Sequence, residues 1–243
     1  MRLRRTPPKP GRALTFVAAV IAVAGLVDCA TYPAAARDGI LGGTVSATSM
    51  RDASRPHVTL VEVMSNAAGT YVDRLLADRD STIERWSERG VAHPLRIWID
   101  SSATIGGAQA GFPAAVRDAF TEWATTGIPL HFEYVTSERG ADIRVQWTDH
   151  LDHKTGSTTW RTDRNGWLIG GDITLATHIS DGHPLDAHGM RAIALHEVGH
   201  ALGMSHSVDS HDVMAPLVRV DGLSVPDRNT VKLLYTLPAG HIR

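Results

Sequence analysis

Histidine is the residue type whose number and placement in this sequence most directly suggest chemistry. Seven of the thirteen histidines lie between His178 and His211. Imidazole is the commonest side-chain ligand of metal ions, so such a cluster predicts a metal site when its spacing lets several rings reach one point. His196, His200 and His206 have this spacing, and we expect them to bind one zinc ion.

The first two of these histidines fall within residues 186–202, where apolar residues recur at the spacing of a helix. Four residues advance a helix by about one turn, roughly 6 Å, so His196 and His200 leave the same face and can reach one ion. Glu197 is displaced around the helix from the first ligand, so it can approach a water molecule without occupying the metal. We expect Glu197 to act as the general base of a hydrolytic reaction.

A glycine that allows the chain to turn back toward the metal comes directly after this predicted helix. Gly203 comes after the last helical residue, and glycine adopts the left-handed conformation that ends helices without steric cost. His206 can then supply a third imidazole, which leaves a fourth position for water, as in catalytic zinc sites. Zinc lowers the pKa of such a water toward about 7 and stabilises an oxyanion, while Glu197 takes the proton during attack on a carbonyl carbon. Histidines that bind no metal would have to match this pattern by coincidence.

Two further segments predict helices ahead of the histidine helix. Residues 71–89 carry apolar residues at roughly the helical repeat, and Gly90 is a suitable stop. Pro113 opens a second helix, which ends before Gly127. The apolar side chains that share one face of this second helix are Phe112, Val116, Phe120 and Trp123.

Alternation with a period of two predicts the strands. It marks residues 95–99, 130–134 and 143–147, and a looser pair broken by glycines occupies residues 157–161 and 167–177. The order is therefore a strand, a helix, two strands, a polar connection, one or two strands and the histidine helix. This order predicts an α+β domain with a mixed sheet.

The composition favours one ordinary domain without a polyanionic partner. The chain has 243 residues, a hydrophobic content of 43% and a formal charge of −2. This length and content suffice to bury one core. Because nucleic acid or an anionic membrane would call for a basic face, which a near-neutral charge does not suggest, we expect neither as a partner.

Residues 1–36 have the layout of an export signal. Five basic residues precede an apolar run over residues 13–27, which is short for a bilayer span, and residues 34–36 offer a small-x-small cleavage site. We expect a mature start near Arg37 and a secreted, extracellular or cell-envelope protein. The alternatives are an uncleaved membrane anchor or a lipid on Cys29, for which the preceding residue is unfavourable.

The mature chain would contain no cysteine, so its metal ligands must be histidine or carboxylate. Residues 37–80 are interpreted as a leader or pro-segment, and residues 81–243 as the catalytic domain.

The sequence His-Glu-Val-Gly-His-Ala-Leu-Gly-Met-Ser-His-Ser at residues 196–207 resembles the extended zinc signature of metzincin peptidases. Within that clan, Asp209 and the Val-Met-Ala-Pro sequence at residues 213–216 are most similar to matrixins. A weaker resemblance extends over residues 81–236. It implies an α+β metzincin (zincin-like) catalytic domain with a mixed twisted sheet, an active-site helix and a small C-terminal subdomain ending in a helix. Met214 would form the apolar floor beneath the metal.

The sequence departs from the matrixin pattern at a second metal site. Vertebrate-type matrixins carry a structural zinc and calcium ions ahead of the active-site helix. His150-x-Asp152 resembles the start of that zinc site, but Thr174 stands where a further histidine is expected, so one zinc ion is predicted and calcium stays open. The other loop histidines are interpreted as solvated side chains. They are His153, His178, His183, His188 and His211.

Two more departures concern the open zinc position. Matrixins are often held latent by a pro-segment cysteine that occupies this position, and residues 37–80 contain none. Pro216 stands where some other metzincins have a tyrosine as an extra ligand, which favours a plain three-histidine site.

These observations lead to the hypothesis of a secreted, monomeric zinc endopeptidase that acts on proteins or peptides. An extended substrate would lie along an edge strand, where main-chain hydrogen bonds can hold many sequences. The mostly apolar residues 217–223 predict a preference for a hydrophobic side chain after the cut. The alternative is a noncatalytic zinc-containing binding module on a peptidase fold, which would have no obvious use for Glu197.

Overall fold

The computed structural model describes residues 58–101 and 106–242. The predicted export signal at residues 1–36, with Cys29, and residues 37–57 of the predicted leader therefore lie outside the described residues. Within the described ranges, no helix combines the length and the apolar composition needed to cross a bilayer.

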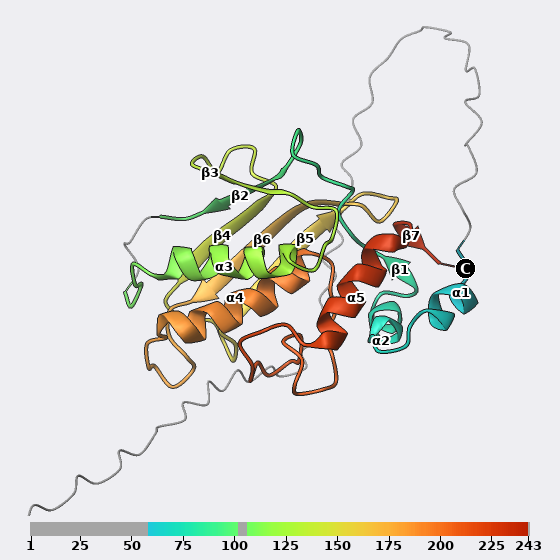
Figure 1. The fold of residues 1–243 in the computed structure, drawn as a ribbon. Helices are drawn as coiled ribbons and strands as arrows, with labels where there is room; N and C mark the ends of the chain where they lie inside the picture. The colour runs from blue at the N-terminus through green and yellow to red at the C-terminus, as the bar shows by residue number, and fades with distance from the viewer. Residues whose placement is uncertain (1–57, 102–105, 243) are drawn as a thin grey trace, which may run out of the picture.

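A five-stranded sheet forms one layer of the molecule (Figure 1). Its members, in the order in which they lie side by side, are β3 (Phe132–Val135), β2 (Leu95–Ile99), β4 (Ile143–Thr148), β6 (Leu168–Ala176) and β5 (Gly156–Thr162). The first four pair in parallel, whereas β5 at the edge runs antiparallel to β6. All five predicted strands are present, and the mixed sheet with its helices confirms the α+β class.

Two long helices, α3 (Phe112–Ala124) and α4 (Ala187–Ala201), form a second layer beside the sheet (Figure 1). Pro113 occupies the first turn of α3, where its missing N–H would have no partner within the helix. The indole of Trp123 donates a hydrogen bond of 2.8 Å to the carbonyl of Leu195, so α3 holds α4 in place. The predicted apolar face of α3 is fully buried and comprises Phe112, Val116, Phe120 and Trp123.

The helix predicted up to Gly90 is much shorter than expected. It spans only Val72–Asp78, as α2. Asp80 and Ser81 have φ values of 47° and 55°, which lie in the left-handed region and cannot continue a right-handed helix. Trp86 is fully buried, but from a segment that forms no helix, so its helical spacing was a coincidence.

The segment after α4 builds the small C-terminal subdomain. Its helix α5 (Val225–Thr236) begins with a capping box, in which the side chains of Ser224 and Asp227 each accept the other's main-chain N–H. After α5, the short strand β7 (Gly240–His241) pairs antiparallel with β1 (Thr82–Ile83). The predicted subdomain ending in a helix is therefore present, with one short strand beyond the helix.

Residues 58–80, part of the predicted leader, include α1 (Leu60–Ser65) and pack against α5 through α2 (Figure 1). The hydroxyl of Tyr71 donates to Asp227 at 2.7 Å, and its N–H donates to Oγ1 of Thr230 at 3.0 Å. The boundary at residue 80 stays a prediction, because a leader can also pack against its domain. The buried apolar side chains of α2 are Val72, Leu75 and Leu76.

Candidate metal centre

Helix α4 carries two of the three predicted ligands, and local sequence sets both of its ends. Asp186 caps its start by accepting a hydrogen bond of 2.7 Å from the N–H of Gly189. After Leu202 the chain turns at Gly203, whose φ of +99° is the left-handed conformation expected there. A Cβ at this position would overlap the carbonyl oxygen of Glu84, so both conformation and space require glycine.

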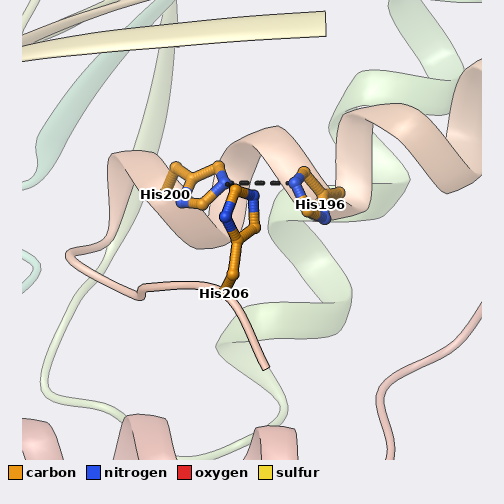
Figure 2. A group of neighbouring side chains, drawn as sticks. All are labelled: His196, His200 and His206. Atoms are coloured by element: carbon orange, nitrogen blue, oxygen red, sulfur yellow. Dashed lines mark hydrogen bonds between the residues drawn. The ribbon is translucent and has the colours of Figure 1, made fainter. Parts of the chain in front are cut away.

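The turn brings His206 back to the two histidines of α4 (Figure 2). Nε2 of His200 lies 3.1 Å from Nε2 of His196 and 3.2 Å from Nε2 of His206. Two nitrogens that each lie about 2.0–2.1 Å from one tetrahedral zinc ion are about 3.3–3.4 Å apart. The spacing of the three donor atoms therefore fits a shared zinc ion.

Main-chain carbonyl groups orient two of the three rings. Nδ1 of His196 lies 2.7 Å from the carbonyl oxygen of Val213, and Nδ1 of His200 lies 2.9 Å from that of Met204. A carbonyl oxygen only accepts, so Nδ1 carries the proton and the lone pair of Nε2 is free for a metal. Burial lowers the pKa of His196 to about 4 and also lowers the pKa of His200 and His206. Neutral imidazole is the form that binds metal ions.

Glu197 is buried between α4 and the edge strand β5. The hydroxyl of Thr158 lies 2.6 Å from its Oε2 and 3.0 Å from its carbonyl oxygen. Gly156 on the same strand leaves room for the carboxylate, because a Cβ there would overlap Oε1. Burial raises the pKa of Glu197 to about 7, although the hydrogen bond from Thr158 opposes this rise. A carboxyl group with such a pKa can accept and release a proton near neutral pH.

Met214 is fully buried and packs against the part of α4 that lies between the two predicted ligands, His196 and His200. A Cβ on Gly199 would overlap its sulfur, so the helix and the methionine are in close contact there. The preceding residue, Val213, donates its N–H to Oδ2 of Asp227 at 2.9 Å and accepts from His196. Helix α5 therefore helps to hold both the predicted apolar floor and one of the predicted ligands.

Sequence reasoning missed two side chains that support the site from distant segments. Arg79, directly after α2, donates from Nη2 to the carbonyl oxygen of Met204 at 3.2 Å, the same oxygen that accepts from His200. Its guanidinium lies 5.0 Å from the ring centre of Trp160. The second side chain is that of Thr158, which contacts Glu197. Met204 lies 125 residues from Arg79, and Glu197 lies 39 residues from Thr158, so no local spacing could have indicated either contact.

The residues that resemble the family's second zinc site are not brought together. Thr174 lies within β6, where it is paired with Gln146 and Ser157 of the neighbouring strands. Asp152 is exposed and takes no part in the cluster of possible ligands that contains His150.

One loop histidine is not solvated as predicted. The side chain of His178 is 18% exposed, and its Nδ1 lies 2.8 Å from Oδ1 of Asp149. The interpretation was wrong for His178 because the segment after β6 lies beside the end of β4, a contact that the sequence could not indicate. The remaining loop histidines are exposed as expected, namely His153, His183, His188 and His211.

Comparison with known proteins finds that the chain is similar to several metalloproteinases. The chain is 26% identical to metalloendoproteinase 1 of Glycine max over 145 residues, which cover 51% of this chain and 45% of that protein. It is 33% identical to matrix metalloproteinase-15 of Homo sapiens over 147 residues, covering 52% and 22% of the two chains. It is 32% identical to interstitial collagenase of Equus caballus over 130 residues, covering 50% and 27%. The chain thus spans less than half the length of these relatives.

The match to a protein family covers the part of the chain that forms the candidate site. The sequence pattern of the family described as matrixin matches residues 98–236, more than half of the chain. This region contains the three converging histidines, Glu197 and the floor methionine, and it accounts for most of the resemblance expected over residues 81–236. The chain therefore belongs to the matrixins, a family of zinc metallopeptidases.

Proposed function

We propose that this protein is an exported zinc-dependent endopeptidase in which His196, His200 and His206 hold the metal and Glu197 is the general base. The convergence of three Nε2 atoms, with a buried carboxylate on the adjoining residue, is the observation that carries this proposal. Export rests on the layout of residues 1–36.

The donor set suits zinc, because three neutral imidazoles bind this ion and leave a position for further ligands. A zinc ion held there would act as a Lewis acid toward a peptide carbonyl and would lower the pKa of water toward about 7.

The protein's own contribution to proton transfer is assigned to Glu197. Since Thr158 donates to Oε2, the other oxygen, Oε1, is left to accept the proton of the attacking water. The pKa of about 7 would let the same carboxyl group pass this proton to the leaving amine.

The edge strand β5 is proposed to align the substrate. Within the described residues, β5 pairs only with β6, so its other edge is free to bind an extended peptide through main-chain hydrogen bonds. Gly156 and Thr158 place this strand directly against Glu197. A peptide added to the strand would therefore pass the metal site.

The side-chain preference is proposed to come from residues 217–223. Val218 is buried, and the main-chain N–H of Leu223 donates to Oε1 of Glu122 at 2.9 Å. Arg191 of α4 also pairs with Glu122, which fixes this loop to the helices beside the site. The apolar composition of the loop favours a hydrophobic residue after the cleaved bond.

Digestion of a proteome-derived peptide library by the purified, zinc-loaded chain tests the proposal, with cleavage sites read by mass spectrometry. We expect cuts before hydrophobic residues, their loss with the zinc chelator 1,10-phenanthroline, and their loss in Glu197→Ala. Glu133→Ala, an exposed glutamate on β3, is the matched control and should cut normally. Zinc binding without any cleavage that depends on Glu197 would overturn the proposal in favour of a noncatalytic binding module.

A further inference from the structure

A second group of metal-ligating side chains lies where two parallel strands end. Thr148, the last residue of β4, pairs with Ala176, the last residue of β6. The residues that follow stay together, since the N–H of His178 donates to the carbonyl oxygen of Asp149 at 3.3 Å. The topology of the sheet thus brings Asp149, His150 and His178 to one point, although His178 is far from the other two in sequence.

The carboxylate of Asp149 faces both imidazoles. Its Oδ1 lies 2.8 Å from Nδ1 of His178, and its Oδ2 lies 2.9 Å from Nδ1 of His150. The two rings are nearly parallel, with an angle of 5° between their planes and 5.2 Å between their centres. One potential ligand atom from each residue lies within 4.8 Å of the others.

The ring of His178 is held in place from several sides. The hydroxyl oxygen of Thr177 lies 3.0 Å from its Nδ1. Gly107 packs against the ring, and any Cβ at that position would overlap it. In contrast, His150 and Asp149 have side-chain exposures of 52% and 58%, so they can adjust around an ion. The cluster therefore combines one fixed imidazole with two adaptable ligands that solvent can reach.

We infer that Asp149, His150 and His178 bind a second divalent transition-metal ion, for which zinc is the best match. Two imidazoles and one carboxylate are a ligand set that zinc accepts, with water completing the coordination. Calcium and magnesium prefer oxygen ligands and do not match. On binding, the ion would replace the protons that the two Nδ1 atoms share with Asp149, and these protons would leave to Nε2 or to solvent.

This site differs from the second zinc site that the family resemblance implies. That site would use His150 with Asp152 and a histidine at the position of Thr174, whereas here Asp149 and His178 complete the set. The inference also stands apart from the proposed peptidase activity, because it uses none of the residues placed at the first metal centre.

The bound ion would tie together the connections that lead to both sides of the active site. Asp149 and His150 begin the connection to β5, and His178 is the second residue of the connection to α4. The latter is already ordered by the hydrogen bond of 2.8 Å from the N–H of Leu185 to the carbonyl oxygen of Thr177. The expected effect is therefore on stability and on metal content rather than on the chemical step.

Metal analysis of the purified full chain, after zinc loading and removal of excess ion, tests the inference. We expect about two equivalents of zinc per chain for the wild type and about one for His150→Gln. Because His150 is half exposed, this variant should fold normally, which circular dichroism checks. Asp149→Asn should give the same loss. His188→Gln and Asp152→Asn, which alter exposed residues outside the cluster, are the matched controls and should keep both equivalents.

A variant of the first metal centre separates the second site from the peptidase activity. His200→Gln removes one of the three proposed ligands of the first centre, so one equivalent of zinc should remain. This equivalent should be lost when His150→Gln is added. Thermal unfolding should show a zinc-dependent rise in Tm for His200→Gln that is absent from the double variant. A wild-type content of one equivalent, or a second equivalent that persists in both His150→Gln and Asp149→Asn, would overturn the inference.

Discussion

A single hydroxyl, that of Thr158, fixes the buried carboxylate of Glu197. Thr158→Val keeps the shape of the side chain but removes this hydrogen bond. We expect kcat to fall by about tenfold with KM nearly unchanged, since general-base catalysis is worth roughly 10²–10⁴-fold in all. The hydrogen bond favours the ionised form, so its loss raises the pKa of Glu197 and moves the acidic limb of the pH–rate profile to higher pH. Steady-state kinetics across the pH range measure both effects.

Two variants serve as controls for this prediction. Thr158→Ser retains a hydroxyl and should restore kcat and the acidic limb. Thr159→Val alters the exposed neighbour on the same strand and should behave as the wild type. An unchanged profile in Thr158→Val would show that the hydroxyl has no positioning role.

Gly203 offers a prediction about the backbone. Gly203→Ala places a Cβ in a residue with a φ of +99° and against the carbonyl oxygen of Glu84. Left-handed strain in a non-glycine residue costs about 1–3 kcal/mol, and the steric overlap adds to this cost. We expect a lower free energy of unfolding in denaturant titrations and weaker zinc retention. Gly182→Ala is the matched control, since it has a φ of +85° but open space around it, and it should lose less stability.

For single residues, the sequence could predict the arrangement of side chains within one helix and the turn that follows it. The spacing of the three histidines and the position of Gly203 are local properties, and both follow from helical geometry. The contact of Thr158 with Glu197 instead depends on how β5 lies against α4. Alternation predicts that a strand exists but not which helix its residues face.

Among the elements, α2 lies far from the candidate metal centre in sequence, but Arg79, directly after it, contacts that centre. Arg79→Met keeps much of the side chain's bulk over Trp160 but removes the hydrogen bond to the carbonyl oxygen of Met204. Because that oxygen orients His200, we expect zinc to bind about tenfold more weakly, at the low end of what outer-shell changes cause. Competition with a chromophoric chelator measures the affinity.

The matched control is Arg74→Met, which removes an ion pair on the exposed face of the same helix. The side chain of Arg74 is 54% exposed and pairs with Asp78, so its loss should change stability little. Arg74 is a positive charge that acts on His206, so its removal should not weaken zinc binding. Equal zinc affinities in the two variants would show that α2 does not support the metal centre.

Sequence patterns identified the strands and two long helices because each has a sustained period and clear stop signals. The helix expected up to Gly90 shows where this reasoning fails. Apolar residues there recur at nearly helical intervals, but Trp86 reaches the core from an extended segment, where its indole donates to the carbonyl of Ala201 at 2.8 Å. Packing in tertiary structure overrides a weak local period.

For the molecule as a whole, the packing of residues 58–80 against α5 leads us to expect that the rest of the described chain needs them to stay folded. Leu75 and Leu76 of α2 are buried, and burial of each such side chain contributes about 1.5–3 kcal/mol. A chain that starts at residue 58 should unfold cooperatively and retain zinc, whereas one that starts at residue 81 should do neither. Circular dichroism and metal analysis compare the two. A folded, active chain from residue 81 would instead support a leader that ends at residue 80.

The hydrogen bond from Val213 to Asp227 of α5 has a consequence for the timing of activity. During synthesis, residue 227 leaves the ribosome after every proposed ligand has already emerged. The carbonyl group of Val213 orients His196. In the nascent chain, the residue that carries this group is therefore not held by Asp227 until α5 has been synthesised and has packed in place. The proposed peptidase would therefore complete its metal centre only after translation has passed residue 227.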